Sequence, residues 1–152
     1  MQYWLMKSEP DEVSIDDVMA SPGQTTAWFG VRNYQARNFM RDQMQVGDGV
    51  LFYHSSCPEP GIAGLAEIVS APYRDATQFD ADSKYYDPKA TQEQPRWISI
   101  DVRGRRKTRL LSLAEMRTQP ALEEMVVLQK GSRLSITPVT PAQWQAVLKL
   151  LK

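Results

Sequence analysis

The sequence has little chemistry that depends on thiols or imidazoles, because it contains one cysteine and one histidine among 152 residues. A single thiol, Cys57, cannot form an intramolecular disulfide, and one Cys with one His cannot build a typical structural zinc site. The sequence therefore predicts no metal and no other cofactor. A lone thiol suits a reducing compartment, so we expect a cytoplasmic protein.

Neither a net charge nor a long hydrophobic run is present. The 18 basic and 18 acidic residues cancel to a formal net charge of zero. This balance argues against a uniformly basic protein that coats nucleic acid, although a local basic patch remains compatible with it. No apolar run approaches the 18 or more residues of a membrane span, so no membrane contact is expected. The N-terminal residues lack a basic leader and a small-residue cleavage site, which is typical of mature sequence.

The pattern of the chain predicts one domain, residues 1–152, of the α+β class. About five or six short strands alternate with short helices, without a βαβ rhythm or repeats, which favours a mixed or antiparallel barrel with peripheral helices. The expected strands cover residues 2–7, 46–55, 61–69, 96–102 and 133–139. The basic run "RGRRKTR", residues 103–109, is expected to be a hairpin or the entry to a strand.

Helix starts are marked by capping residues. Expected caps are Ser14 (with Asp17) before residues 15–20, Asn33 before a helix reaching residue 44, Ser112, and Thr140 followed by proline. Between the strands, residues 71–95 are polar and contain several prolines. A loop of that length is rarely idle in a compact domain, so a binding or lid role is expected.

Catalysis has weak support in the sequence. The motif "HSSC", residues 54–57, places a histidine, serines and a cysteine side by side, but neighbours on a strand point to opposite faces and do not form a dyad. No G-x-S-x-G motif or phosphate-binding glycine loop is present. We therefore expect a protein that is not an enzyme. An enzyme or small-ligand binder acting on a modified nucleotide is the alternative, and a protein-interaction module is a third.

The stretch "WFGVRNYQARNFMR", residues 28–41, combines aromatic, amide and arginine side chains without an acid. Aromatic planes can stack on a base, amides can bind its edge, and guanidinium groups can bind phosphate. By composition alone the stretch also fits a core element with solvated arginines. In this stretch the predicted phosphate contacts are Arg32, Arg37 and Arg41.

A second polar cluster, "MKSEP", leaves the end of the first expected strand. Lys7, Ser8 and Glu9 either form a capped turn with a surface ion pair or provide a polar rim that binds a base edge. The residues alone do not decide between these interpretations.

Several long motifs resemble one known family. "YWLMKSEP", "WFGVRNYQARNFMR", "GDGVLFYHS", "PGIAGLAEIV", "YYDPK" and "LSITPVT" occur in this order from Tyr3 to Thr140. Together they resemble the EVE domain family over nearly the whole chain.

The resemblance implies a PUA-like fold, a small, partly open β-barrel with short helices around it, shared with YTH domains that read methylated adenine in RNA. It implies a non-catalytic module that binds nucleic acid and holds one modified base, in some relatives a modified cytosine in DNA. The choice between DNA and RNA stays open, and a monomer or weak oligomer is expected. The pocket positions of the family correspond to Trp28, Lys7, Ser8, Glu9, Asn33, Tyr34, His54, Ser55, Tyr85 and Tyr86.

Overall fold

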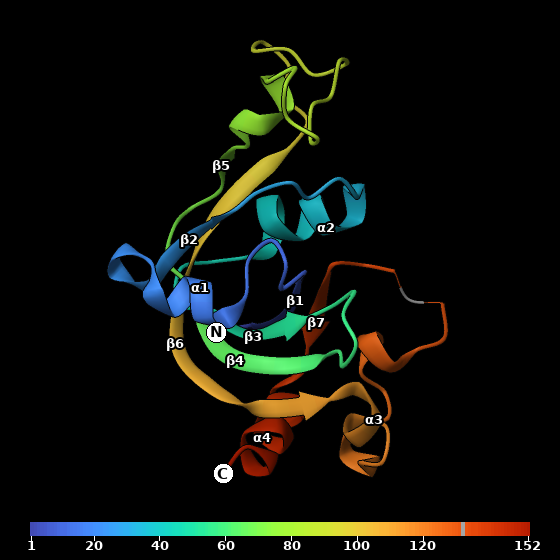
Figure 1. Cartoon of the computed structure of the whole chain (residues 1–152). Helices are drawn as coiled ribbons and strands as arrows, with labels where there is room; N and C mark the ends of the chain where they lie inside the picture. The colour runs from blue at the N-terminus through green and yellow to red at the C-terminus, as the bar shows by residue number, and fades with distance from the viewer. Residues whose placement is uncertain (132) are drawn as a thin grey trace.

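A computed structural model describes residues 1–131 and 133–152 and is built around one curved, open sheet (Figure 1). Within these residues the sheet has seven strands: β1 (Tyr3–Ser8), β2 (Thr25–Trp28), β3 (Gly49–His54), β4 (Gly61–Ile68), β5 (Tyr73–Arg74), β6 (Ile98–Ser112) and β7 (Ile136–Val139). The strand order is β2-β6-β4-β3-β1-β7, with β5 beside β6. The predicted fold class is confirmed, but β2 and β5 bring the strand number above the expected five or six.

The long strand β6 provides much of the curvature. It runs for 15 residues and pairs with β2, β4 and β5. Its register with β4 shifts twice, and such bulges bend a sheet. The "RGRRKTR" run lies inside β6 and is not a hairpin, because Arg103, Gly104, Arg106 and Lys107 all pair with the same strand, β4.

Short helices surround the sheet. They are α1 (Ile15–Ala20), α2 (Tyr34–Asn38), which continues as a π-helical turn over Phe39–Gln43, α3 (Leu113–Met116) and α4 (Pro141–Leu150). All four predicted caps are confirmed, since the side chains of Ser14, Asn33, Ser112 and Thr140 each accept a backbone N–H from the first turn. The change to a π-helical turn after Asn38 was not expected.

The sheet separates two hydrophobic clusters because alternate side chains of each strand face opposite sides. Trp4 and Phe52 belong to the cluster beneath α1 and α2, whereas Leu5 and Leu51 belong to the cluster beneath α4. On the α4 side, Trp144 stacks on Tyr3 with ring centroids 4.5 Å apart. The hydrophobic clusters on the two faces of the sheet thus hold in place the strand ends from which the site is built.

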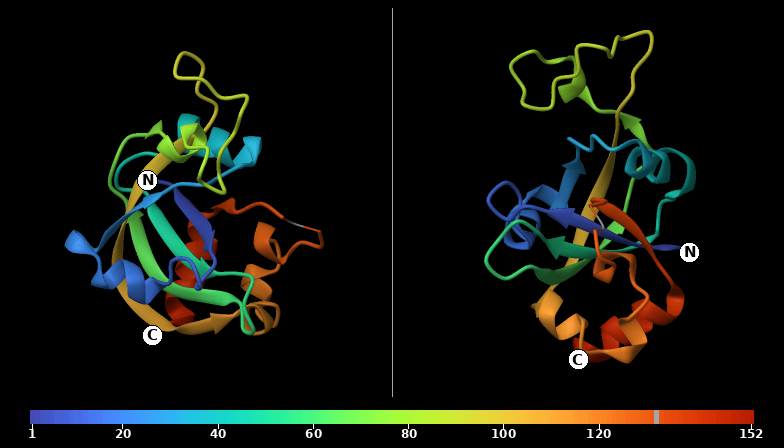
Figure 2. Two further views of the ribbon diagram at one scale, coloured as in Figure 1. Left: turned by 45° about the horizontal axis from the view of Figure 1, so that its top comes forward. Right: turned by 90° about the vertical axis from the view of Figure 1, so that its right-hand side faces the viewer.

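Residues 71–97 form a lobe beyond one end of the sheet, opposite α4 (Figure 2). The lobe contains β5 and a turn of 3₁₀ helix, Ala76–Phe79. Gln78 is fully buried and holds the lobe together, since its amide donates to the carbonyls of Asp75 and Trp97 and accepts from the N–H groups of Arg96 and Trp97. The segment predicted as a long functional loop is therefore an ordered lobe.

Candidate functional site

A cavity of about 720 Å³ opens where β1 and β2 end, beside the lobe. Ligand pockets in proteins typically have volumes of roughly 300 to 1,000 Å³. Seven of the predicted pocket residues line the cavity: Lys7, Ser8, Glu9, Trp28, Asn33, Ser55 and Tyr85. Further lining residues that the sequence analysis did not single out include Glu12, Thr26, Lys84, Arg133 and Ser135. The site therefore joins segments distant in sequence around one hollow.

Trp28 forms one wall of the cavity and is only 8% exposed. Its ring meets Phe52 edge-on, with centroids 5.5 Å apart. The indole N–H groups of Trp4 and Trp97 donate to carboxylates at 3.0 Å and 2.7 Å. The indole N–H of Trp28 has no acceptor among the described residues. The Trp28 nitrogen is not among the fully buried polar atoms that lack a partner, so water or a ligand acceptor in the cavity can bind its N–H.

The end of β1 carries two polar side chains at the cavity: Ser8, which is hydrogen-bonded within the protein, and Lys7, which has no ion-pair partner among the described residues. The Ser8 hydroxyl donates to the Val13 carbonyl at 2.6 Å, which leaves it only as an acceptor for a ligand. Lys7 is half-buried and has no carboxylate within ion-pair distance in the described part of the chain. Burial lowers the pKa of Lys7. Its ammonium group is thus a positive charge without a counter-ion at the cavity wall.

Tyr85 closes the side of the cavity formed by the lobe. Gly30 allows this, because its φ is 79° and an added Cβ would lie 2.7 Å from the Tyr85 ring. The Tyr85 hydroxyl donates to the Glu12 carboxylate at 3.0 Å, and Lys84 forms an ion pair with the same carboxylate. Glu12 therefore ties the lobe to the turn after β1 across the cavity.

Arg32 organises the lobe instead of facing a phosphate. Its five N–H groups are all used within the protein: they donate to the carbonyls of Val31 and Tyr85, to the Asp75 carboxylate and to the Thr77 hydroxyl. Although Arg32 touches the cavity, no donor is left for a ligand. This geometry gives Arg32 a structural role in place of the predicted phosphate contact.

Asp75 is the fully buried partner of Arg32 and the centre of this network. Its carboxylate also accepts from the Gly30 N–H at 2.7 Å and from the Thr77 N–H at 2.8 Å. Burial alone would raise the pKa of Asp75, but the hydrogen bonds from Thr77, Gly30 and Arg32 outweigh it and lower the pKa. The ionised carboxylate thereby fixes the turn that carries Gly30.

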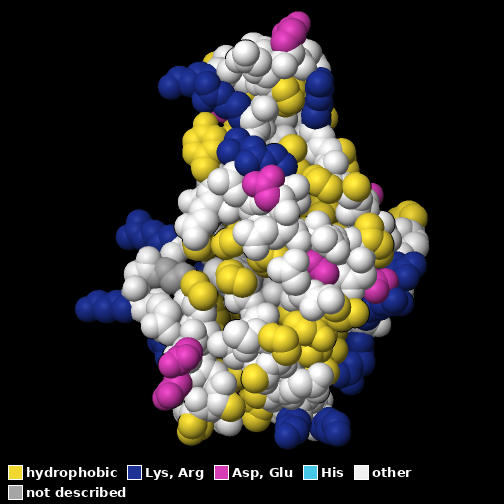
Figure 3. Space-filling model, turned by 180° about the vertical axis from the view of Figure 1, so that it is seen from behind, with side chains coloured by type: hydrophobic (Ala, Val, Ile, Leu, Met, Phe, Trp, Pro, Cys, Tyr) yellow, Lys and Arg dark blue, Asp and Glu magenta, His cyan; other side chains and the backbone are white. Residues whose placement is uncertain are grey.

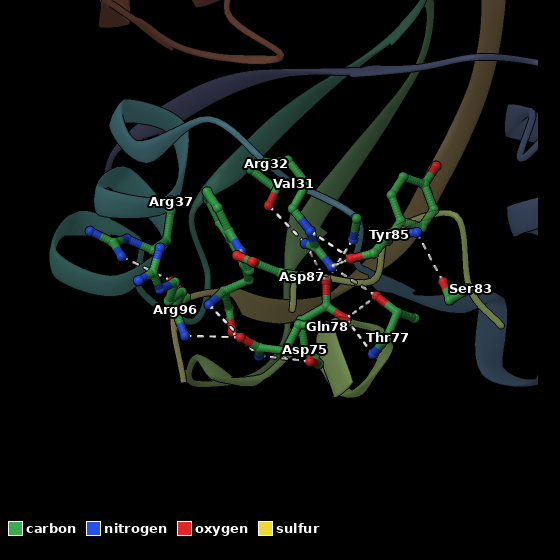
Figure 4. Close-up of polar contacts among 12 residues, drawn as sticks. Val31, Arg32, Arg37, Asp75, Thr77, Gln78, Ser83, Tyr85, Asp87 and Arg96 are labelled. Carbon is green, nitrogen blue, oxygen red and sulfur yellow. Dashed lines mark hydrogen bonds and ion pairs between the residues drawn. The ribbon is translucent and has the colours of Figure 1, made fainter. Parts of the chain in front are cut away.

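The remaining predicted residues lie outside the cavity lining. His54 accepts the Ile15 N–H at its Nε2, 3.1 Å away, and burial lowers its pKa. Tyr34 stacks on Trp97, and Tyr86 is exposed. Arg41 pairs with its neighbour Asp42 on the surface. Arg37 of α2 lies over the Tyr34 ring, and Figure 4 shows it at the opposite side of the view from Tyr85.

We predict that Gly30→Ala destabilises the protein and displaces Tyr85. The left-handed backbone costs roughly 1–2 kcal/mol for a residue with a Cβ, and the collision with the Tyr85 ring adds to that cost. Gly131→Ala is the matched control, because its φ is also 79° and its Cβ would meet no described atom within 4 Å. The comparison uses the free energy of unfolding in urea. An equal decrease of this free energy in both variants would show that the contact with Tyr85 adds nothing to the cost of the substitution.

The described residues hold no group of three or more His, Cys, Asp or Glu side chains placed to bind a metal ion. In residues 1–131 and 133–152, no helix is both long and apolar enough to cross a membrane. What the fold offers is a cavity with an aromatic wall and polar and cationic groups around it.

A curved open sheet with such a cavity at its strand ends agrees with the PUA-like binding domain that the sequence motifs imply. The EVE domain model matches residues 2–150, and the chain belongs to the EVE domain family. It is 44% identical to human thymocyte nuclear protein 1 over 97% of this chain and 73% of that protein.

Solved structures agree with this assignment. A protein from Pseudomonas syringae is 52% identical, with a TM-score of 0.94 over 99% of both chains. The human THYN1 protein, solved in complex with DNA that contains 5-methylcytosine, is 44% identical, with a TM-score of 0.91 over 100% of this chain and 98% of that one. The fold implied by the sequence motifs is therefore confirmed.

Proposed function

We propose that this protein binds nucleic acid and holds one modified base in the cavity beside Trp28 without altering it chemically. The observation that carries the proposal is the Trp28 indole N–H, which lies in a cavity wall without an acceptor among the described residues. The structure of human THYN1 with DNA containing 5-methylcytosine supports a modified cytosine as the ligand. The choice of DNA over RNA rests on the same relative.

The energetics of such binding require several kinds of contact. Removing a base from a duplex costs a few kcal/mol, and stacking on an aromatic side chain returns roughly 1–3 kcal/mol. A methyl group adds only about 0.8 kcal/mol when it is fully buried. Edge hydrogen bonds and phosphate contacts must provide the rest, which is why aromatic, amide and cationic groups share one cavity.

The described lining residues offer such groups with free capacity. The Asn33 side-chain oxygen caps α2 by accepting the Ala36 N–H at 3.0 Å, so its amide N–H groups remain for a base edge. The Ser55 hydroxyl and the Glu9 carboxylate have no protein partner among the described residues. Lys7 and Arg133 are cations without a carboxylate partner in the same part of the chain, and suit the phosphate of the captured nucleotide.

Binding without chemistry is the simplest use of this cavity. A nucleophilic mechanism would need His54, Ser55 and Cys57 together, and of these only Ser55 lines the cavity. His54 uses its Nε2 to accept the Ile15 N–H. Its lowered pKa follows from burial, which fits a neutral, structural imidazole. The cytoplasmic location and the monomeric or weakly oligomeric state stay predictions.

We expect that oligonucleotides with a central 5-methylcytosine bind more tightly than the same oligonucleotides with cytosine. Fluorescence anisotropy with DNA and RNA forms measures the preference, and mass spectrometry after incubation should find the oligonucleotides unchanged. Asn33→Ser keeps the helix cap but removes the amide donor, and should weaken binding by about 0.5–1.5 kcal/mol, or roughly two- to tenfold. Equal affinity for marked and unmarked strands, or a protein-dependent mass change, would contradict the proposal.

A further inference from the structure

A row of aromatic and cationic side chains begins at Tyr85 in the cavity wall and ends at Arg37; Figure 4 labels its members Tyr85, Arg32 and Arg37. The Arg32 guanidinium lies between the rings of Tyr85 and Trp97, 5.6 and 5.3 Å from their centroids. Tyr34 stacks on Trp97 at 4.8 Å, and the Arg37 guanidinium lies 4.7 Å from the Tyr34 centroid. Each member contacts the next, so the outer end has a fixed position relative to the cavity.

The outer end of this row is exposed. Tyr34 is 48% exposed although its ring is stacked. Arg96 donates to the Tyr34 hydroxyl at 3.3 Å, and Arg37 donates to the Arg96 carbonyl at 2.9 Å. The three side chains, from α2 and from the end of the lobe, therefore form one surface. We call Tyr34, Arg37 and Arg96 the outer arginine surface.

Neither guanidinium group of the outer arginine surface forms an ion pair within the described residues. The other acceptor of the Arg37 guanidinium is the neutral Asn38 side chain, and neither Arg37 nor Arg96 has a carboxylate within ion-pair distance there. Burial first, and then the charge of Arg41, lowers the pKa of Arg37, which still stays protonated because an arginine loses its proton only far above neutral pH.

Most of the other arginines among the described residues form an ion pair with a carboxylate. Arg32 pairs with Asp75 and Arg41 with Asp42. The basic run on β6 is largely neutralised as well. Arg103 and Arg105 pair with Glu67, Lys107 with Asp16, and Arg109 with Glu115. The rear face in Figure 3 shows Lys and Arg side chains beside hydrophobic ones around the lobe. Among the described residues, Arg74, Arg106, Arg117 and Arg133 also form no ion pair. The outer arginine surface differs because two such guanidinium groups contact one exposed ring, that of Tyr34.

We propose that the outer arginine surface binds the strand that flanks the captured base, with phosphates on Arg37 and Arg96 and a base or sugar against Tyr34. Guanidinium groups bind phosphate through paired hydrogen bonds, and exposed rings stack on bases of any sequence. The steps of 5.6, 5.3 and 4.8 Å from Tyr85 to Tyr34 reach at most the length of roughly four to five nucleotides at about 3.4 Å each. The inference rests on the proposed function only in taking nucleic acid as the partner.

The test compares the double variant Arg37→Gln, Arg96→Gln with the single variant Arg41→Gln and with Trp28→Phe. The probe is a single-stranded oligodeoxynucleotide with one central 5-methylcytosine, together with its cytosine counterpart. Affinity is measured over a series of salt concentrations. Two lost phosphate contacts should reduce the slope of log K against log salt by about 1.4 units on a single strand, while the ratio of affinities for marked and unmarked strands stays constant. Arg41→Gln, whose charge is already paired with Asp42, should leave the slope nearly unchanged.

The possible outcomes separate this inference from the proposed function. The proposal that the outer arginine surface binds the flanking strand would be overturned by a salt slope that is unchanged in the double variant. It would also be overturned by a slope that falls equally in Arg41→Gln. A loss of the marked-to-unmarked ratio in the double variant would also overturn it, because the arginines would then act through the cavity. The slope could fall as expected while wild type and Trp28→Phe both bind strands with 5-methylcytosine and with cytosine equally well. In that case the proposed role of the outer arginine surface is supported and the base-pocket proposal fails. Absence of any binding by the wild type would overturn both.

Discussion

Asp75→Ala is expected to cost about 3–5 kcal/mol of the free energy of unfolding, which is the usual result of leaving one member of a buried ion pair alone. The Asp75 carboxylate is fully buried and serves Arg32, Gly30 and Thr77 together. Without it, the guanidinium of Arg32, only 22% exposed, keeps its charge but loses its counter-ion. Because a domain typically has only 5–15 kcal/mol in total, urea unfolding should detect the loss easily.

The pH dependence provides a second readout of the same network. The pKa of Asp75 is lower in the folded protein than in an unfolded chain, so its stabilisation is present above the unfolded value of about 3.9. That stabilisation disappears as the pH falls through the folded pKa, and Asp75→Ala should remove this part of the acid sensitivity. Asp82→Ala, an exposed carboxylate in the same lobe, is the control. A similar stability for both variants would mean that Arg32 is held by its carbonyl acceptors alone.

Trp28→Ala should weaken binding of an oligonucleotide with 5-methylcytosine by roughly five- to 150-fold, the equivalent of 1–3 kcal/mol of base stacking. The substitution also removes a nearly buried indole and should lower the free energy of unfolding by about 3–5 kcal/mol. Binding is therefore measured at a temperature well below the midpoint of thermal unfolding of the variant. Far-UV circular dichroism checks that the variant is folded.

Trp28→Phe separates the aromatic plane from the indole N–H. It keeps a ring in the cavity wall beside Phe52 but removes the donor that has no acceptor among the described residues. We expect an intermediate loss of affinity. An unchanged affinity in both Trp28 variants, with the fold intact, would place the bound base elsewhere.

Much of the fold could be predicted from the sequence because its signals are local. Serine, asparagine and threonine caps identified the helix starts, and alternating or continuous apolar runs identified β1, β3 and β4. The strands β2 and β5 carry no such signal, since they are four and two residues long and depend on pairing with β6. Pairing of this kind is decided by tertiary contacts and not by the pattern of a short segment.

The site was less predictable, for a physical reason. Residue types indicate which contacts are available, but not which partner takes them. Arg32, Arg37 and Arg41 are equivalent in the sequence, yet the structure places them against Asp75, a tyrosine ring and Asp42 respectively. The partner of Arg32 is 43 residues away, and no local pattern encodes that separation.

The position of β1 in the sheet has a consequence for how the chain folds during synthesis. β1 is synthesised before the other strands of the sheet, pairs in parallel with β3 and is flanked on its other edge by β7, where Tyr3 lies opposite Val139. A nascent chain therefore carries an open strand edge until nearly all of this sequence has been translated. Non-local pairing of this kind slows folding, and an unpaired edge invites contact with other nascent chains. The charged residue Lys7, near the end of β1, limits that hazard until β7 pairs with this edge.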